Sequence, residues 1–110
     1  MTIREAAEAL GAKIVQDEFE NTELTGAYTS DLLSDVMANA KEGGALITIQ
    51  AHKNTVAVAT LVNISAVIIC NSRPLPEDFI ASAKEEGIAI LLTKENQYTV
   101  SGKLYGMLNS

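Results

Sequence analysis

The sequence predicts an α/β fold, a single three-layer domain with a mainly parallel sheet built from successive βα units. From Ser30 onward, helical and strand-like patterns alternate at a steady spacing, which is typical of βαβ units. Residues 66–70 form a short, β-branched, wholly apolar run, as expected for a strand that helices cover on both faces. With 110 residues, 47% of them hydrophobic, the chain can bury one core without disulfides. We therefore expect one domain over residues 1–110.

The first third of the chain is expected to contain a helix, a strand and a loop. Residues 2–10 are charged and helix-prone and predict a helix, and alternating polarity predicts a strand at residues 13–16. The polar stretch 17–25 is interpreted as a loop. Gly26 then leads into a short β-prone piece that ends at Tyr28.

The middle of the chain predicts two βα units. Ser30 is expected to cap a helix that a glycine pair stops, because apolar residues recur there at helical period: Leu32, Leu33, Val36, Met37 and Ala40. A strand is predicted at residues 46–49. Asn54 is expected to cap a helix over residues 55–62, and the apolar strand at residues 66–70 follows it.

The last third predicts a helix, a strand and a final helix. Pro76, at a first helical turn before two acidic residues, opens a helix that Gly87 ends. Residues 88–92 predict the third strand of the series. The tail over residues 96–108 has apolar residues at helical spacing and is predicted as a helix, although Gly102 and Gly106 weaken it.

The composition and charge argue against nucleic acid and anionic membranes as partners, and the N-terminus argues against secretion. The formal net charge is −6 and no cluster of Lys or Arg reverses it locally, so nucleic acid and anionic membranes are poor partners. The N-terminal residues lack the apolar region of a signal peptide, and no apolar stretch approaches the length of about 20 residues that spans a bilayer. We expect a cytoplasmic protein. Its single cysteine, Cys70, ends an apolar run and is predicted to be a small buried hydrophobe.

The sequence contains no recognisable catalytic or metal-binding motif. Walker A, Gly-x-Ser-x-Gly, Gly-x-Gly-x-x-Gly, His-Glu-x-x-His and Cys-x-x-Cys patterns are all absent. His52 is the only histidine, so a His-rich metal site is excluded and a catalytic triad would have to be built around this residue. Asp31 and Asp35 are expected one helical turn apart, where they would hold a divalent cation or act as paired carboxylates; we favour a solvated acidic face. We predict no catalytic residue, no metal, no cofactor and no enzyme.

The loops after the predicted parallel strands are the best candidate for a binding site, because ligands of open parallel sheets bind beyond the carboxyl ends of the strands. Each of three loops contains a cation next to the start of a helix, so we expect an anion site for phosphate or a nucleotide. The alternative is that loops are polar anyway and the cations fall there by chance. The predicted ligand-binding residues are His52, Lys53, Asn54, Asn71, Ser72, Arg73, Thr93 and Lys94.

The helix predicted over residues 55–62 is apolar almost all round and rich in small residues, so it is expected to be deeply covered. In a domain of this size the cover is either the core or a second subunit, and two-fold dimers are the commonest closed assembly. We predict a homodimer in which Leu61 and Val62 are candidate contacts.

Core and capping segments between residues 26 and 93 also match a known pattern. Gly-Ala-Tyr-Thr-Ser-Asp-Leu-Leu-Ser-Asp-Val-Met is followed by Gly-Ala-Leu-Ile-Thr-Ile and Ala-Val-Ile-Ile, and in this order the segments resemble the DRTGG domain family. The resemblance implies a non-catalytic α/β regulatory domain, as found beside nucleotide-sensing CBS domains in certain pyrophosphatases and within some phosphate acetyltransferases, with a fold similar to the N-terminal domain of HPr kinase. Two departures stand out: His52-Lys53 replaces the family's Asp-Arg, and Cys70-Asn71-Ser72 replaces its Thr-Gly-Gly.

Three functional hypotheses follow. The leading one is a homodimeric regulatory domain that binds a small anionic ligand, with an adenine nucleotide or phosphate as the candidate, at the carboxyl ends of the strands and signals to a partner. The alternative is a ligand-free accessory subunit that docks on a separate enzyme, since short versions of the domain are similar to accessory proteins of multi-subunit redox complexes. The third, an unrecognised hydrolase or transferase that uses His52, needs a nucleophile and base that no visible motif supplies.

Overall fold

A five-stranded sheet forms the centre of the structure, a computed structural model that describes residues 1–109. The strands lie in the order β1-β5-β4-β3-β2. Strands β2 to β5 are parallel, and β1 pairs antiparallel with β5 at one edge. The predicted fold class, α/β with a mainly parallel sheet, is therefore confirmed. The strands are β1 (Lys13–Gln16), β2 (Ala27–Thr29), β3 (Ala45–Thr48), β4 (Ala66–Ile69) and β5 (Ala89–Leu92).

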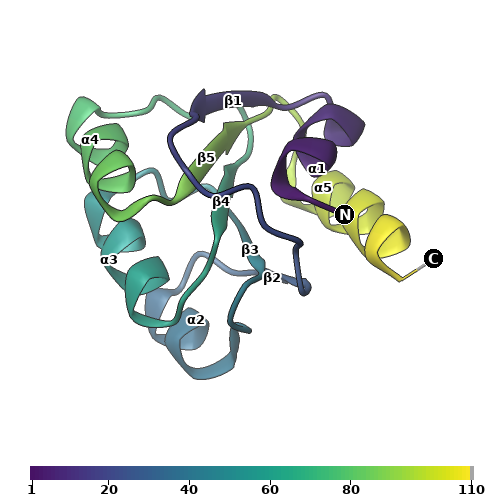
Figure 1. The fold of residues 1–110 in the computed structure, drawn as a ribbon, viewed down its shortest axis with the longest axis horizontal. Helices are drawn as coiled ribbons and strands as arrows, with labels where there is room; N and C mark the ends of the chain where they lie inside the picture. The colour runs from purple at the N-terminus through teal and green to yellow at the C-terminus, as the bar shows by residue number, and fades with distance from the viewer. Residues whose placement is uncertain (110) are drawn as a thin grey trace.

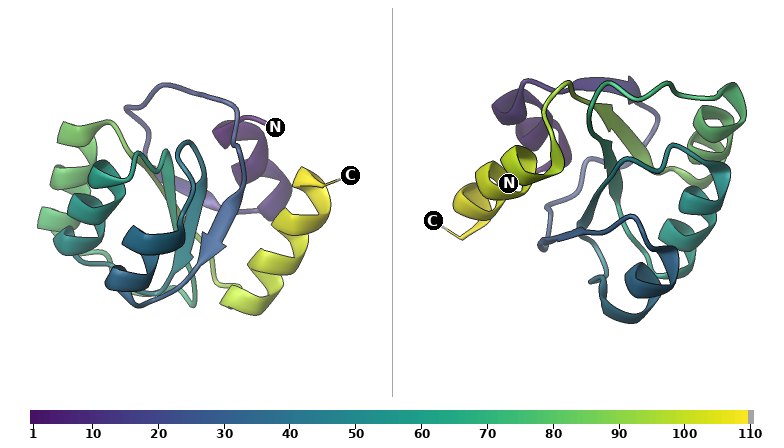
Figure 2. Two further views of the ribbon diagram at one scale, coloured as in Figure 1. Left: turned by 90° about the horizontal axis from the view of Figure 1, so that it is seen from below. Right: turned by 180° about the vertical axis from the view of Figure 1, so that it is seen from behind.

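Helices cover both faces of the sheet and make it the middle of three layers (Figures 1 and 2). In the left view of Figure 2, α1 and α5 lie on one side of the sheet, and α2, α3 and α4 lie on the other. Within residues 1–109, none of the helices combines the length and the apolar character needed to cross a bilayer. The helices are α1 (Ile3–Leu10), α2 (Leu33–Asn39), α3 (Lys53–Leu61), α4 (Glu77–Glu86) and α5 (Gln97–Leu108).

Two hydrophobic clusters, one on each face of the sheet, form the core. Because side chains alternate along a strand, Ile68 of β4 packs in the cluster with α1 and α5, whereas Val67 and Ile69 pack in the cluster with α2, α3 and α4. Every residue of β3 and β4 is buried. This double cover explains why the segment at residues 66–70 is apolar throughout, as the sequence predicted.

Several helix ends follow capping signals that are visible in the sequence. Thr2 and Glu5 form a capping box at the start of α1. Asn96 caps α5, where its Oδ1 accepts a hydrogen bond from the N–H of Thr99 at 2.9 Å. Gly87 adopts the left-handed conformation, with φ of +68°, and ends α4. These helices agree with the predicted ones to within a few residues.

Two helix starts differ from the prediction. The hydroxyl oxygen of Ser30 accepts a hydrogen bond from the N–H of Leu32 at 3.1 Å, which closes a turn ahead of α2 and leaves the helix to begin at Leu33. In α3, Nδ1 of His52 accepts a hydrogen bond from the N–H of Asn54 at 3.0 Å. His52, and not Asn54, is therefore the cap of this helix.

The predicted deep cover of the apolar helix α3 is wrong within a single copy of the chain. Only Thr55, Val56 and Ala59 of this helix are buried, because it packs on the sheet by one face, and Leu61 is 69% exposed. The neighbouring helix α2 is also buried along one narrow face only. Val36 is its one buried residue, although the period of its apolar residues predicted a wider buried face.

Candidate functional site

The parallel strands β3, β4 and β5 end at the same edge of the sheet, which we call the carboxyl edge. The predicted ligand-binding residues lie in the three loops that follow these strands, except Lys53 and Asn54, which form the start of α3. The structure therefore brings all eight to one edge. Lys13 lies at this edge too, because β1 runs antiparallel and Lys13 pairs with Leu92, the last residue of β5. Sequence reasoning missed Lys13, since an alternating pattern does not give the direction of a strand.

The loop after β3 is held to the start of α3 by side-chain hydrogen bonds. Nδ1 of His52 is occupied by the N–H of Asn54, and the hydroxyl of Thr55 donates to the carbonyl oxygen of Gln50 at 2.8 Å. The side chains of Lys53 and Asn54 are exposed. His52 therefore caps the helix through Nδ1, and its side chain is exposed, as are those of Lys53 and Asn54.

The loop after β4 contains two consecutive residues with left-handed backbone. Asn71 has φ of +60° and Ser72 has φ of +49°, a region that favours glycine. The sequence resemblance implies glycines at these two positions, and both residues that stand there in this chain have left-handed backbone. The N–H of Asn71 donates to the carbonyl oxygen of Glu95 at 3.0 Å, and the N–H of Ser72 donates to that of Thr93 at 2.9 Å. Both N–H groups therefore hold the loop after β5 and are not open to an anion.

The loop after β5 combines a buried threonine with an exposed lysine. Thr93 is buried, and its hydroxyl oxygen accepts a hydrogen bond from the N–H of Glu95 at 3.1 Å. Lys94 is exposed, as is Arg73 in the neighbouring loop. Thr93 therefore shapes its loop, whereas Lys94 and Arg73 present their charges to solvent.

Asp31, in the loop after β2, joins three elements at the carboxyl edge. Its Oδ1 accepts three hydrogen bonds: from Oγ1 of Thr48 at 2.8 Å, from the N–H of Ile49 at 2.9 Å and from Nε2 of Gln97 at 3.0 Å. Burial by itself raises the pKa of Asp31, but these hydrogen bonds and the charge of Arg73 outweigh it and lower the pKa below its ordinary value. The carboxylate therefore stays ionised and links this loop to β3 and α5.

The expected pairing of Asp31 with Asp35 on one helix face is wrong. Asp31 precedes α2, and the carboxylate of Asp35 is engaged elsewhere, since it accepts hydrogen bonds from the hydroxyl of Tyr28 and from Nδ2 of Asn39, each at 2.9 Å. Hydrogen bonds from Ser30 and Tyr28 lower the pKa of Asp35. No group of three or more His, Cys, Asp and Glu side chains within residues 1–109 is arranged to hold a metal ion.

The carboxyl edge collects cations in an acidic chain, but it contains anions as well. Of the eight Lys and Arg residues, those at this edge are Lys13, Lys53, Arg73 and Lys94. The acidic residues of the same edge are Asp31, Glu77, Asp78 and Glu95. The helices α3, α4 and α5 begin here, and their N-termini add positive potential. The carboxylate of Asp31 is held by its three hydrogen bonds, whereas Glu77 and Asp78 are exposed, as the four cations are. A ligand would therefore meet charges of both signs at this edge.

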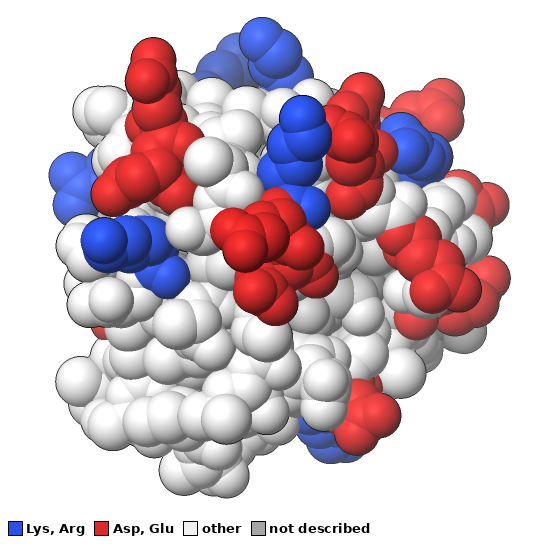
Figure 3. Space-filling view, turned by 60° about the vertical axis from the view of Figure 1, so that its left-hand side comes forward, with Lys and Arg blue, Asp and Glu red and all other residues white. Residues whose placement is uncertain are grey.

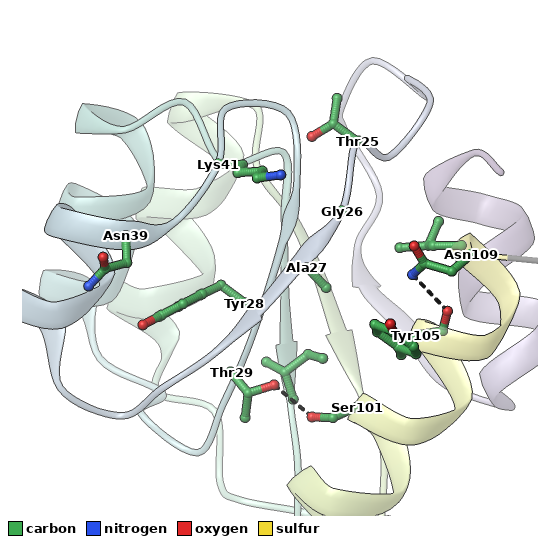
Figure 4. Close-up of a pocket in the computed structure, with 12 residues that line it drawn as sticks. Thr25, Gly26, Ala27, Tyr28, Thr29, Asn39, Lys41, Ser101, Tyr105 and Asn109 are labelled. Carbon is green, nitrogen blue, oxygen red and sulfur yellow. Dashed lines mark hydrogen bonds between the residues drawn. The ribbon is translucent and has the colours of Figure 1, made fainter.

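The structure contains one hollow beside the carboxyl edge and another that lies apart from it. The first, of about 450 Å³, lies between α3 and α4 and includes Lys53 and Asn54 in its lining, together with Glu85 and Glu86. The second, of about 510 Å³, lies along β2 between α2 and α5 (Figure 4). It contains none of the eight predicted residues. Sequence reasoning missed it, because which strand lies at the edge of a sheet depends on tertiary pairing.

Comparison with known proteins agrees with this fold. No curated protein matches the chain. Among solved structures, the CBS and DRTGG domains of the regulatory region of Clostridium perfringens pyrophosphatase, complexed with the activator diadenosine tetraphosphate, have a TM-score of 0.72 and 16% sequence identity. The match covers 94% of this chain and 45% of that chain, and at this identity it shows the fold alone. The model of the DRTGG domain family matches residues 5–107, and the chain therefore belongs to that family.

Proposed function

We propose that this chain is a non-catalytic, homodimeric regulatory domain that binds a small anionic ligand at the carboxyl edge and signals to a partner protein. An adenine nucleotide is the first ligand to test. The observation that carries the proposal is the placement of Lys13, Lys53, Arg73 and Lys94 at one edge of the sheet in a chain of net charge −6. Membership of a family of regulatory domains supports it.

Electrostatics favours phosphate at this edge. Lys53 is both an exposed cation and the first residue of α3, so its ammonium group and the N-terminus of the helix attract an anion to the same place. Arg73 and Lys94 lie in the two neighbouring loops and are exposed. A ligand with several phosphate groups offers acceptor oxygens over a longer span than a single phosphate does, which suits cations that come from three separate segments.

The pyrophosphatase region of similar fold supplies the first ligand to test. That protein is described with an activator, diadenosine tetraphosphate. The molecule combines two adenine rings with a chain of phosphates, which is the chemistry that a row of cations beside helix N-termini attracts. For this chain the dinucleotide is a candidate, because the two proteins are 16% identical.

A thermal-shift screen tests the proposal. The panel contains adenine and guanine nucleotides, diadenosine tetraphosphate and phosphate, each with and without magnesium. A ligand at about 100 times its Kd stabilises the fold by about 2.7 kcal/mol, so binding is visible as a higher Tm. The double variant Lys53→Ala, Arg73→Ala is expected to lose the shift. The control is Lys84→Ala, Lys103→Ala, which removes the same charge from exposed positions in α4 and α5.

The two variants separate a site from general electrostatics. A shift that disappears in the first variant and persists in the control supports a site at the carboxyl edge. If both variants lose the ligand-induced rise in Tm equally, binding depends on the net charge of the protein alone, and a site at the carboxyl edge is refuted. A flat response of the wild-type protein over the whole panel refutes ligand binding altogether.

A second candidate is the accessory subunit that docks on an enzyme complex without a ligand. It is favoured by an uncharged area over α2 and α3, with exposed Leu32, Met37 and Leu61 at 65%, 46% and 69%. Figure 3 shows the lower left of this side of the molecule as free of charged residues, with one acidic and one basic residue at the lower right. Residues 54–72 contain no charged residue at all. Capture of an enzyme that Leu61→Glu abolishes, together with a flat nucleotide response, would favour this function.

A further inference from the structure

The two edges of the sheet differ in how they are protected against pairing with another strand. At the β1 edge, the register shifts between Ile14 and Gln16, and the exposed Lys13 begins the strand. A bulge and an edge lysine are devices that prevent edge-to-edge pairing. At the β2 edge, the strand Ala27–Thr29 contains no charge and no proline, and it pairs with β3 in unbroken register. The β2 edge is therefore the one prepared to accept another strand.

The hydrogen bonds of β2 show which of its groups face outward. The carbonyl oxygen of Gly26 accepts from the N–H of Ala45, and the N–H of Ser30 donates to the carbonyl oxygen of Ile47. Residues of a strand alternate in the side to which their N–H and C=O groups point. The main-chain N–H and C=O groups of Tyr28 therefore point toward β3, as the bonded groups of Gly26 and Ser30 do. The main-chain groups of Ala27 and Thr29 point the other way and face the open edge of the sheet.

The hollow of about 510 Å³ lies over these outward groups and has walls on both sides. Figure 4 looks onto β2, with Tyr28 and Asn39 on the side of α2, and with Thr29, Ser101 and Tyr105 on the side of α5. The hydroxyls of Thr29 and Ser101 are hydrogen bonded at 2.6 Å. Lys41 is the single charged residue in the lining. We call this hollow, whose lining contains one charged residue, the slot.

We propose that the occupant of this slot is β2 of a second copy, paired antiparallel about a two-fold axis at Tyr28, so that one continuous sheet runs through both copies. In this register each Ala27 lies opposite Thr29 of the other copy, and the two residues exchange both of their main-chain hydrogen bonds. The two Tyr28 residues then face each other as a non-hydrogen-bonded pair. The inference rests on the self-association that belongs to the proposed function, and it names the surface.

Charge explains why a second copy fits better than an unrelated peptide. Each copy has a net charge of −6, so two copies repel except where they meet through uncharged surface. Lys41 lies beyond the end of α2 and lines the slot near Thr25 and Gly26, whereas Asp35 lies in the first turn of α2. Antiparallel pairing reverses one copy against the other and brings Lys41 of each toward Asp35 of the other. Because the β1 edge is protected, the assembly stops at two copies.

A strand of three residues is short, so the helices must add to the contact. Tyr105 of α5 lines the slot and is 72% exposed in the single copy. Aromatic side chains are enriched at the centres of protein interfaces because they bury a large area with few rotatable bonds. Tyr105 is therefore expected to become buried in the dimer, beside the paired strands.

Cysteine cross-linking tests the register directly. In a Cys70→Ala background, Tyr28→Cys places two cysteines across the two-fold axis with Cα atoms about 4.5 Å apart, which is within the range of a disulfide. The matched control is Thr25→Cys, whose two copies would lie about 20 Å apart at 3.4 Å per residue. Under mild oxidation, Tyr28→Cys is expected to form a covalent dimer rapidly and Thr25→Cys is not.

A second pair of variants tests the same edge by light scattering. Thr29→Pro removes an outward N–H and is expected to be monomeric, whereas Thr29→Ala removes the hydroxyl contact with Ser101 but keeps the N–H and is expected to remain dimeric. A monomeric wild-type protein at micromolar concentration would overturn both this inference and the self-association in the proposed function, while the nucleotide screen would still decide ligand binding. A wild-type dimer without selective cross-linking at position 28 overturns the β2 surface alone.

Discussion

Gln97, the first residue of α5, donates a hydrogen bond from its Nε2 to Oδ1 of Asp31 over 3.0 Å. The two residues are 66 positions apart, so the bond joins the loop after β2 to the last helix of the chain. The same oxygen accepts the N–H of Ile49, just beyond the end of β3. Asp31 is therefore a structural centre of the carboxyl edge, and its substitution has consequences that a surface carboxylate would not have.

Replacement of Asp31 by alanine is expected to lower the free energy of unfolding by about 1–3 kcal/mol, because the N–H of Ile49 and the hydroxyl of Thr48 lose their acceptor. Asp31→Asn keeps an acceptor oxygen and is expected to cost less. Urea unfolding measures both, with the exposed Asp17→Ala as the control. Equal effects of Asp31→Ala and Asp17→Ala would contradict the role assigned to Asp31.

The contribution of Asp31 to stability depends on pH in a definite direction. Its pKa in the folded chain lies below the ordinary value of 3.8, so the unfolded chain takes up the proton first as the pH falls. The stabilisation is therefore complete above that value and is lost as the pH falls through the lower, folded pKa. Glu5 and Asp35, whose pKa values are also lowered, act in the same direction.

The difference between wild type and Asp31→Asn isolates this contribution from those of Glu5 and Asp35. Unfolding free energies measured from about pH 8 down to about pH 3 are expected to show a constant difference at neutral pH that shrinks below about pH 4. A difference that stays constant down to the lowest pH would mean that the charge of Asp31 does not stabilise the fold.

Most of the fold could be predicted from the sequence, but little of the geometry of the candidate site could. Local signals, such as the helix stop at Gly87 and the wholly apolar β4, act within a few positions and were correctly interpreted. The three hydrogen bonds of Asp31, the place of Lys13 at the carboxyl edge and the open side of β2 depend on which strands pair and in which direction. No periodicity of one chain contains that information, because strand pairing joins distant segments.

Glycine at position 72 is expected to stabilise the chain. Ser72 has φ of +49°, and an L-residue with a side chain is disfavoured in this region by about 1–2 kcal/mol, part of which the greater freedom of glycine in the unfolded state offsets. Ser72→Gly should therefore raise the free energy of unfolding by about 0.5–1 kcal/mol. Asn71→Gly should gain less, because asparagine tolerates this conformation better.

The control for these glycine variants is Ser72→Ala, which removes the hydroxyl but keeps the Cβ atom and should not stabilise. Urea unfolding compares the variants. If Ser72→Gly destabilises the chain, then the backbone of this loop is not left-handed at that position.

Cys70 is expected to resist thiol reagents as long as the chain is folded. Its side chain is fully buried, and burial, together with the negative charge of Asp31, raises the pKa of the thiol to about 11. The thiolate is the reactive form, so at about pH 8 both its low population and its inaccessibility slow the reaction. Alkylation followed by mass spectrometry should show slow modification in buffer and fast modification above the urea midpoint. An added Ser34→Cys, on the exposed side of α2, should react at once in the same sample. Equal rates at the two positions in buffer would mean that the loop after β4 opens readily and does not hold the carboxyl edge together.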